Sequence, residues 1–298
     1  MILLETHILP IGAPTARLSD YAAGMFRHIP TRKGMKKAIG RGEVFVNGTR
    51  ATTGKYVRAG DVVELYDAEV KVQPRFDFAI EVIYEDEDLA VVNKPAGLVT
   101  AGHQFRTLQH CLPHNLRPSN AVPALKYPRP VHRLDAPTSG LVIVAKTPAS
   151  LYHLGEMFAL RKVEKTYRAV VIGRPAECGT WDAPIEEKPS LTHYQTLQTV
   201  PSLRNKHLSL LQLSPLSGRT HQIRKHTSDA GFPIFGDKIY GTPGEIYHGK
   251  GLFLAAVGLR FSHPLTGRKI DIFIETPPKF LSLLRREARR FTTFNAEE

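Results

Sequence analysis

Apolar residues in this chain fall into short runs that turn-forming residues separate. Residues 141–145 are all apolar, which is the pattern of a strand buried on both faces. Residues 81–84 and 89–92 flank the acidic turn 85–88 and predict a hairpin. Two further strands are expected at 161–173 and 270–274. Helices are expected at 151–160, from residue 220 onward and at 278–290, and the segment 104–130 is expected to contain a helix with a loop.

An N-terminal segment, about residues 16–65, has the pattern of a separate small unit. Thr31 is placed to cap a helix that Gly40 and Gly42 end. Strands are expected at 43–46 and 49–51 around the Asn47-Gly48 turn, and again at 62–65. The helix carries four cations: Arg32, Lys33, Lys36 and Lys37. Like charges four residues apart repel each other in a free helix, so this spacing favours a polyanion as partner.

The length of 298 residues is sufficient for two domains. We place one at 1–72 and the second at 76–290, with a linker at 70–75 and a loose tail at 291–298. Lys and Arg number 40 against 28 Asp and Glu, which leaves a formal net charge of +12. Such an excess favours nucleic acid as the partner, over the alternative of a merely soluble basic protein.

Cysteine and histidine spacing gives no sign of a metal site. Cys111 and Cys178 form no CxxC pair, so neither zinc nor a disulfide framework is expected. His221 and His226 lie five residues apart without an HExxH motif. The first ten residues lack the pattern of a secretory signal, and no apolar window has the length of a membrane span. We therefore expect a cytoplasmic protein without membrane contact or bound metal.

Asp135 is the candidate catalytic group, because it stands at the mouth of the apolar run 141–145. The turn formers at 136–140 hold it just outside that strand, and His132 and Arg133 are potential cations beside it. A carboxylate so placed is expected to be ionised and oriented. The alternative interpretation is an Asp that caps a turn and forms a surface ion pair with Arg133.

Four further motifs accompany the string HRLDAPTSGL at 132–141: KPAG at 94–97, KTYRAVVIG at 165–173, SGRTHQIR at 217–224 and a closing segment at 252–267. Together they resemble the RluA-like pseudouridine synthases of the ribosomal large subunit type. Ser217 stands where that family has Thr, and Ala255 where it has His.

The resemblance implies an α+β fold with a mixed, mostly antiparallel central sheet and flanking helices. It implies that Asp135 is the nucleophile, that Tyr167 lies against the uracil ring, and that Arg219 pairs with Asp135. Arg133 would fill the space that the flipped base leaves, and His132 is counted with it as RNA-binding. The reaction needs no cofactor, and attack at carbon 6 of the uracil or at carbon 1 of the ribose remains open.

The segment GRGEVFVNGTRATTGKYVRAGDVVEL at 40–65 resembles the small S-four RNA-binding domain, which implies that Arg32, Lys33, Lys36 and Lys37 contact RNA. We expect a monomer without a nucleotide cofactor that isomerises uridines in large-subunit ribosomal RNA. The alternatives are a synthase that acts on tRNA and a non-catalytic RNA-binding factor for ribosome assembly. A carboxylate-dependent hydrolase would need a second acid at matched spacing, and no motif supplies one.

Overall fold

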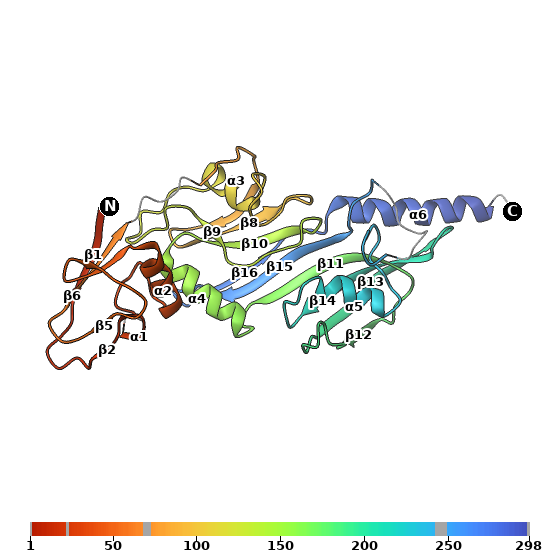
Figure 1. The fold of residues 1–298 in the computed structure, drawn as a ribbon. Helices are drawn as coiled ribbons and strands as arrows, with labels where there is room; N and C mark the ends of the chain where they lie inside the picture. The colour runs from red at the N-terminus through yellow and green to blue at the C-terminus, as the bar shows by residue number, and fades with distance from the viewer. Residues whose placement is uncertain (1, 22–23, 68–72, 242–248, 297–298) are drawn as a thin grey trace.

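The computed structural model describes residues 2–21, 24–67, 73–241 and 249–296. A small N-terminal unit lies at one end of the molecule, and helix α6 lies at the opposite end, with a long twisted sheet between them (Figure 1). This architecture is the expected α+β class. Residues 70–72 of the expected linker lie outside the described residues.

The central sheet has ten strands: β7 (Glu81–Glu85), β8 (Leu89–Lys94), β9 (Arg129–Pro130), β10 (Ser139–Ala145), β11 (Glu164–Ile172), β12 (Cys178–Trp181), β13 (Thr192–Ser202), β14 (Lys206–Pro215), β15 (Leu254–Ser262) and β16 (Lys269–Phe273). Its main path runs β12-β13-β14-β11-β15-β10-β8-β7, while β16 pairs with β15 and β9 with β10. Strands β10 and β15 run parallel, whereas the other pairs described in this sheet are antiparallel. The expected mixed, mostly antiparallel sheet is confirmed.

Four helices accompany this sheet: α3 (Leu108–Asn115), α4 (Pro148–Ala159), α5 (Gln222–Asp229) and α6 (Pro278–Ala296). None of the helices within the described residues is both long and apolar enough to cross a membrane. The expected loose tail at 291–298 is wrong for residues 291–296, because α6 continues through them. Residues 297–298 lie outside the described part.

Strand β10 is buried on both faces, as its unbroken apolar run predicts. Leu141 and Ile143 belong to one hydrophobic cluster, whereas Val142 and Val144 belong to a second cluster on the other face. Strand alternation distributes these side chains to opposite faces. The strand that follows Asp135 is therefore held from both sides by the core.

Gly140 allows β10 to approach β15 closely. Its φ is +118°, and a Cβ atom there would lie 2.0 Å from the carbonyl oxygen of Ala256. Since that obstacle is backbone, a larger residue could be accommodated only by moving one of the two strands. The glycine thereby fixes where the chain leaves the loop of Asp135 and enters the sheet.

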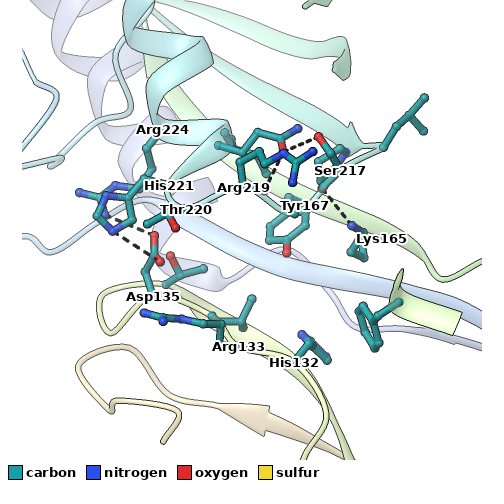
Figure 2. Close-up of a pocket in the computed structure, with 18 of the residues that line it drawn as sticks. His132, Arg133, Asp135, Lys165, Tyr167, Ser217, Arg219, Thr220, His221 and Arg224 are labelled. Atoms are coloured by element: carbon teal, nitrogen blue, oxygen red, sulfur yellow. Dashed lines mark hydrogen bonds and ion pairs between the residues drawn. The ribbon is translucent and has the colours of Figure 1, made fainter. Parts of the chain in front are cut away.

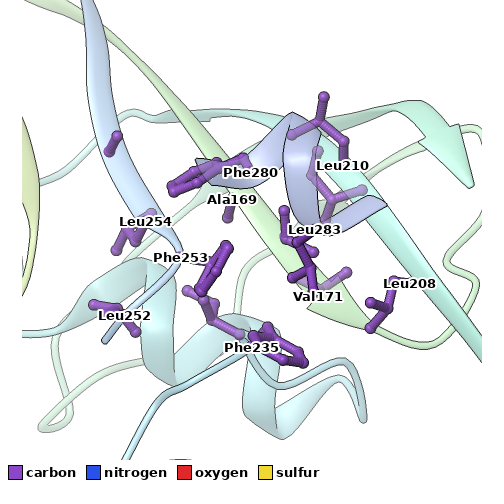
Figure 3. Packing of buried hydrophobic residues seen from close by; sticks show 14 of the residues in the cluster. Ala169, Val171, Leu208, Leu210, Phe235, Leu252, Phe253, Leu254, Phe280 and Leu283 are labelled. Carbon is purple, nitrogen blue, oxygen red and sulfur yellow. The ribbon is translucent and has the colours of Figure 1, made fainter. Parts of the chain in front are cut away.

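A third cluster packs helix α6 and the segment after α5 against the other half of the sheet (Figure 3). Phe280 and Leu283 of α6 are buried beside Phe253 and Phe235, and the rings of Phe235 and Phe253 meet edge to face at 5.0 Å. Burial of aromatic rings gives this end of the sheet a large apolar contact area. The cluster supports β11 and β14, which carry or adjoin candidate site residues.

The N-terminal unit contains β1 (Ile2–Ile8), β2 (Ala16–Arg17), α1 (Leu18–Tyr21), α2 (Arg32–Arg41), β3 (Val44–Val46), β4 (Thr49–Arg50), β5 (Tyr56–Val57) and β6 (Val62–Asp67). Its main sheet has the order β1-β6-β3-β4. The β3–β4 hairpin is confirmed. The sequence interpretation missed β1, because that strand is formed by pairing with β6 some 60 residues away.

Helix α2 begins and ends as its sequence predicts, with one difference. The hydroxyl of Thr31 accepts a hydrogen bond from the N–H of Gly34, and Gly42 adopts φ 74° at the C-cap. Gly40, expected to end the helix, lies inside it. A Cβ atom on Gly34 would lie 2.9 Å from a methyl carbon of Ile29, so close packing accounts for this glycine within a helix.

We predict that Gly140→Ala lowers the free energy of unfolding by at least about 2 kcal/mol, because it combines an unfavourable φ with a backbone clash. Gly155→Ala is the matched control: Gly155 is an exposed residue inside α4 with open space around its Cα. It should raise the free energy of unfolding by about 0.5–1 kcal/mol. Urea unfolding of both variants is the measurement, and equal effects would contradict the close β10–β15 approach as the cause.

Candidate active site

A pocket of about 560 Å³ lies where the loop before β10, the end of α4, the start of β11 and the turn before α5 meet. Its lining includes Asp135, Tyr167 and Arg219, which the sequence nominated as catalytic, and also His132 and Arg133 (Figure 2). These five residues span 87 positions of the sequence, from 132 to 219, and the fold brings them to one pocket.

Two buried groups fix the loop of Asp135 to the segment after β8. The ammonium of Lys94 donates hydrogen bonds to the carbonyls of Pro95 (3.0 Å), Leu98 (2.7 Å) and Ala136 (3.2 Å). Burial lowers the pKa of Lys94 to about 8, and the charge of Asp135 opposes that shift. The KPAG element, by itself a surface turn, therefore clamps the residue next to Asp135.

Thr100 makes the second clamp on this loop. Its hydroxyl donates to the carbonyl of Leu134 (2.9 Å) and lies 3.1 Å from the N–H of the same residue. The backbone on both sides of Asp135 is therefore hydrogen-bonded, while the carboxylate itself projects into the pocket. Such a carboxylate is oriented without being enclosed.

Arg224 is the cation that contacts Asp135. Its Nη1 lies 3.3 Å from Oδ2 of Asp135, while its Nε and Nη2 form a pair of hydrogen bonds to Asp237 at 2.7 and 2.8 Å. Both Arg224 and Asp237 are buried. Burial alone would raise the pKa of Asp237, but hydrogen bonds from Arg224 and from the N–H groups of Ile239 and Tyr240 outweigh it and lower that pKa.

The expected pairing of Arg219 with Asp135 is wrong. Arg219 lines the pocket, but its Nη2 is directed to the carbonyl of Pro189 at 3.4 Å. Its own N–H donates to the side-chain oxygen of Gln222, and helix α5 begins at that glutamine. Arg224 in the first turns of α5 therefore faces Asp135. The motif SGRTHQIR contains both arginines, so the signal was present, but the sequence does not show which one the turn directs inward.

His221 is a second neighbour of Asp135 that the sequence interpretation did not identify. Its Nε2 lies 3.6 Å from Oδ1 of Asp135, and its Nδ1 lies 3.0 Å from the hydroxyl of Tyr240. The residue adopts φ 56°, directly before α5. The alternative interpretation, a surface ion pair between Arg133 and Asp135, is wrong, because Arg133 is exposed at the rim of the pocket and Asp135 contacts Arg224 instead.

His132 is neutral rather than the cation that its sequence position suggested. Its Nε2 accepts a hydrogen bond from the N–H of Ile143 (3.0 Å), and its ring stacks on Phe158 at 4.6 Å. Burial, and then the charge of Lys165, lower the pKa of His132 to about 3. The imidazole is therefore an uncharged part of the pocket wall at pH 7.

Tyr167 lies on β11, lines the pocket and packs against two hydrophobic clusters. Burial, followed by the negative charge of Asp135, raises the pKa of Tyr167, so its phenol is protonated at neutral pH. Lys165 lies two residues earlier on the same strand and lines the same pocket.

A metal-type cluster exists elsewhere among the described residues. Asp86, Asp88 and His263 bring ligand atoms within 4.8 Å of one another. However, Nδ1 of His263 accepts hydrogen bonds from the N–H groups of Leu265 and Thr266, so its proton sits on Nε2 and points to Asp86. That arrangement fastens two turns together and leaves no free ring nitrogen for an ion.

The cations of α2 lie in the N-terminal unit and do not line the pocket. All four are exposed, and Arg32 pairs with Asp20 at 2.6 Å. Lys33, Lys36 and Lys37 therefore present the positive charge of this helix to solvent.

Comparisons with known proteins identify relatives of this chain. A family model described as RNA pseudouridylate synthase matches residues 88–229, which include Asp135, Tyr167 and Arg224. An "Uncharacterized RNA pseudouridine synthase" of Aquifex aeolicus (strain VF5) is 33% identical over 282 residues, 85% of this chain and 88% of that protein. "Ribosomal large subunit pseudouridine synthase C" of Vibrio vulnificus (strain CMCP6) is 33% identical over 286 residues, 86% of this chain and 88% of that protein. The solved structure of human RNA Pseudouridylate Synthase Domain Containing 4 matches in fold, with a TM-score of 0.56 and 23% identity over 69% of this chain and 92% of that one.

We predict that Arg224→Met lowers the free energy of unfolding by about 3–5 kcal/mol, because it leaves the buried carboxylate of Asp237 without its cation. Arg219→Met removes a guanidinium of the same size from the same pocket, but only a long hydrogen bond is lost, and about 1 kcal/mol or less is expected. Urea unfolding of the two variants measures the difference. If Arg219→Met lost more free energy of unfolding than Arg224→Met, the result would favour the pairing of Arg219 with Asp135 that the sequence predicted.

Proposed function

Because this chain belongs to the RNA pseudouridine synthase family and is an isomerase that converts uridine to pseudouridine, we propose that Asp135 is its nucleophile and large-subunit ribosomal RNA its substrate. The observation that carries the nucleophile is the position of one carboxylate in the pocket, held by Arg224 and facing Tyr167 (Figure 2). Support for the RNA class comes from relatives that are named for the ribosomal large subunit.

The reaction breaks the bond between ribose carbon 1 and uracil nitrogen 1, and joins the same ribose carbon to uracil carbon 5. The proton on carbon 5 leaves and nitrogen 1 gains a proton, so the composition of the RNA does not change. An ionised carboxylate can begin this exchange at carbon 6 of the uracil or at carbon 1 of the ribose. In either route Arg224 orients Asp135, and the ring of Tyr167 bounds the base.

The target base must leave its stack to reach this pocket, which costs a few kcal/mol. Arg133 is exposed at the rim of the pocket, where it can occupy the space that the base vacates. Lys33, Lys36 and Lys37 on α2 would offset part of the cost by binding phosphates. We propose that the N-terminal unit is an S-four-like RNA-binding domain in this sense.

Asp135→Asn should abolish release of tritium from carbon 5 of uridine, because an amide cannot act as the nucleophile. The substrate is ribosomal and transfer RNA from cells that lack this protein, each labelled at carbon 5. Asp182→Asn is the control, since Asp182 is exposed and does not line the pocket. Full release by Asp135→Asn would overturn the nucleophile. Release by the wild type from transfer RNA alone would overturn the ribosomal substrate.

Replacing Lys33, Lys36 and Lys37 together by Ser should raise KM and leave kcat unchanged, because phosphate contacts contribute equally to ground and transition states. The dependence of log KM on log salt should become shallower by about two units. Steady-state tritium release at several salt concentrations is the measurement. The matched control removes three exposed lysines of the catalytic domain, Lys188, Lys206 and Lys269. If the control changed the salt dependence of KM equally, the effect of the α2 lysines would come from the net charge of the protein and not from their position.

A further inference from the structure

Lys165 and Tyr167 project from one face of β11 into the pocket, because they lie two residues apart on a strand. Figure 2 shows Asp135 on one side of the Tyr167 ring and Lys165 on the other. A base placed against that ring, with its ribose toward the carboxylate, therefore extends toward the ammonium of Lys165.

Hydrogen bonding leaves the Lys165 ammonium with unused capacity. Its Nζ donates to the carbonyl of Ser217 at 3.1 Å, and within the described ranges no carboxylate lies at ion-pair distance from it. An ammonium carries three donor hydrogens. Burial, and then the nearby charge of Arg161, lower the pKa of Lys165.

Lys165 is half-buried, and two fully buried lysines, Lys94 and Lys146, serve as a comparison because their hydrogen bonds hold the fold. Lys94 donates to three backbone carbonyls, and Lys146 bonds to the carboxylate of Glu85 (2.8 Å) and the carbonyl of Asp86 (2.6 Å). Lys165 has neither a counter-ion nor a complete set of acceptors among the described residues. Keeping a cation partly out of water without such partners is costly, which is understandable where an anion arrives during function.

The isomerisation creates such an anion in either route. If Asp135 attacks carbon 6, the electrons of the carbon 5–carbon 6 double bond move toward the oxygen on carbon 4. If Asp135 attacks ribose carbon 1, the electrons of the broken bond leave with the base and spread over nitrogen 1 and both carbonyl oxygens. The base loses this charge when carbon 5 has bonded to ribose carbon 1 and the bond between the substrate and Asp135 has broken, which returns the electron pair to the carboxylate. Carbon 5 then gives up its proton and nitrogen 1 gains one.

We propose that the ammonium of Lys165 donates a hydrogen bond to a carbonyl oxygen of the flipped uracil and stabilises the negative charge that develops there. Lys165 remains protonated throughout and transfers no proton. The role rests on the proposed action of Asp135, but it holds for both possible sites of attack. It makes Lys165 a catalytic residue rather than a phosphate contact.

The test is the single-turnover rate of tritium release at saturating RNA. Lys165→Met should lower that rate about 100- to 1000-fold with little change in RNA affinity, as for loss of one donor to a developing oxyanion. Lys165→Arg should recover part of the loss because it keeps the charge. Lys162→Met is the control, since Lys162 is an exposed lysine just before the same strand and does not line the pocket. Weakened RNA binding with an unchanged saturated rate would instead make Lys165 a phosphate contact, and would refute the proposal.

A second measurement separates direct contact with the base from a merely structural role. RNA transcripts in which sulfur replaces the oxygen on carbon 2 or on carbon 4 of uridine present a weaker hydrogen-bond acceptor. For one of the two, sulfur should slow the wild type more than Lys165→Met, because the variant has already lost that hydrogen bond. Equal slowing of both proteins by both sulfur substitutions would mean that Lys165 acts only by holding Ser217. The role of Lys165 is decided by the ratio of the Lys165→Met rate to the wild-type rate, which can be measured on whichever RNA class is a substrate. The proposed function is decided separately, by which RNA class responds and by the result for Asp135→Asn.

Discussion

The guanidinium of Arg224 is the interaction on which the candidate site depends, because it joins carboxylates from two distant parts of the chain. Its short pair of bonds goes to the buried Asp237, and its longer bond of 3.3 Å goes to Asp135. A buried guanidinium requires a counter-ion at all times, and Asp237 supplies it. Asp135 can therefore leave Arg224 and engage a substrate without stranding a buried cation. If one carboxylate were both the counter-ion of Arg224 and the group that engages the substrate, its reaction would leave the buried guanidinium unpaired and would destabilise the fold.

The backbone around Asp135 is constrained as firmly as its side chain is left accessible. Gly140 lets β10 run against β15 at a distance that no Cβ permits, and the buried faces of β10 hold the strand in place. On the opposite side, Lys94 and Thr100 bond the backbone of the loop itself. The cost of desolvating Lys94 is offset by three carbonyls and by the nearby charge of Asp135. Preorganisation of this kind lets a carboxylate face an open pocket in one orientation.

What the sequence predicted well depends on local pattern. The placement of Asp135 before a doubly buried strand follows from turn formers and an unbroken apolar run, and the α2 cap follows from Thr31. What it predicted badly depends on tertiary direction. Arg219 and Arg224 share one motif, and only the turn into α5 decides which faces Asp135. The position of His132 beside Asp135 in the sequence suggested a cation, but burial lowers the pKa of His132 and keeps its ring neutral.

The same distinction applies to the two ends of the chain. Strand β1 is formed through its pairing with β6, so its own residues show only a brief apolar run. Helix α6 continues past residue 290 although residues 292–296 are exposed, so the apolar stripe that predicts a helix is already lost there. Local hydrogen bonding, once begun in the packed part of α6, extends the helix beyond its buried face.

The charges in the pocket suit the proposed reaction, in which negative charge leaves Asp135 and later returns to it. His132 is neutral, and the raised pKa of Tyr167 keeps its phenol neutral as well. Neither ring therefore competes with Asp135 as a base or an anion. In the proposed mechanism the carboxylate of Asp135 begins as the negative group, which Arg224 balances, and the negative charge moves to the uracil when the carboxylate bonds to the substrate. Under that proposal a second cation stabilises the charge if it lies beyond the base rather than beside Asp135, and Lys165 lies on that side of Tyr167. Arg224 and Lys165 lie on opposite sides of the Tyr167 ring (Figure 2), so the negative charge would have a cation beside it both on Asp135 and on the uracil.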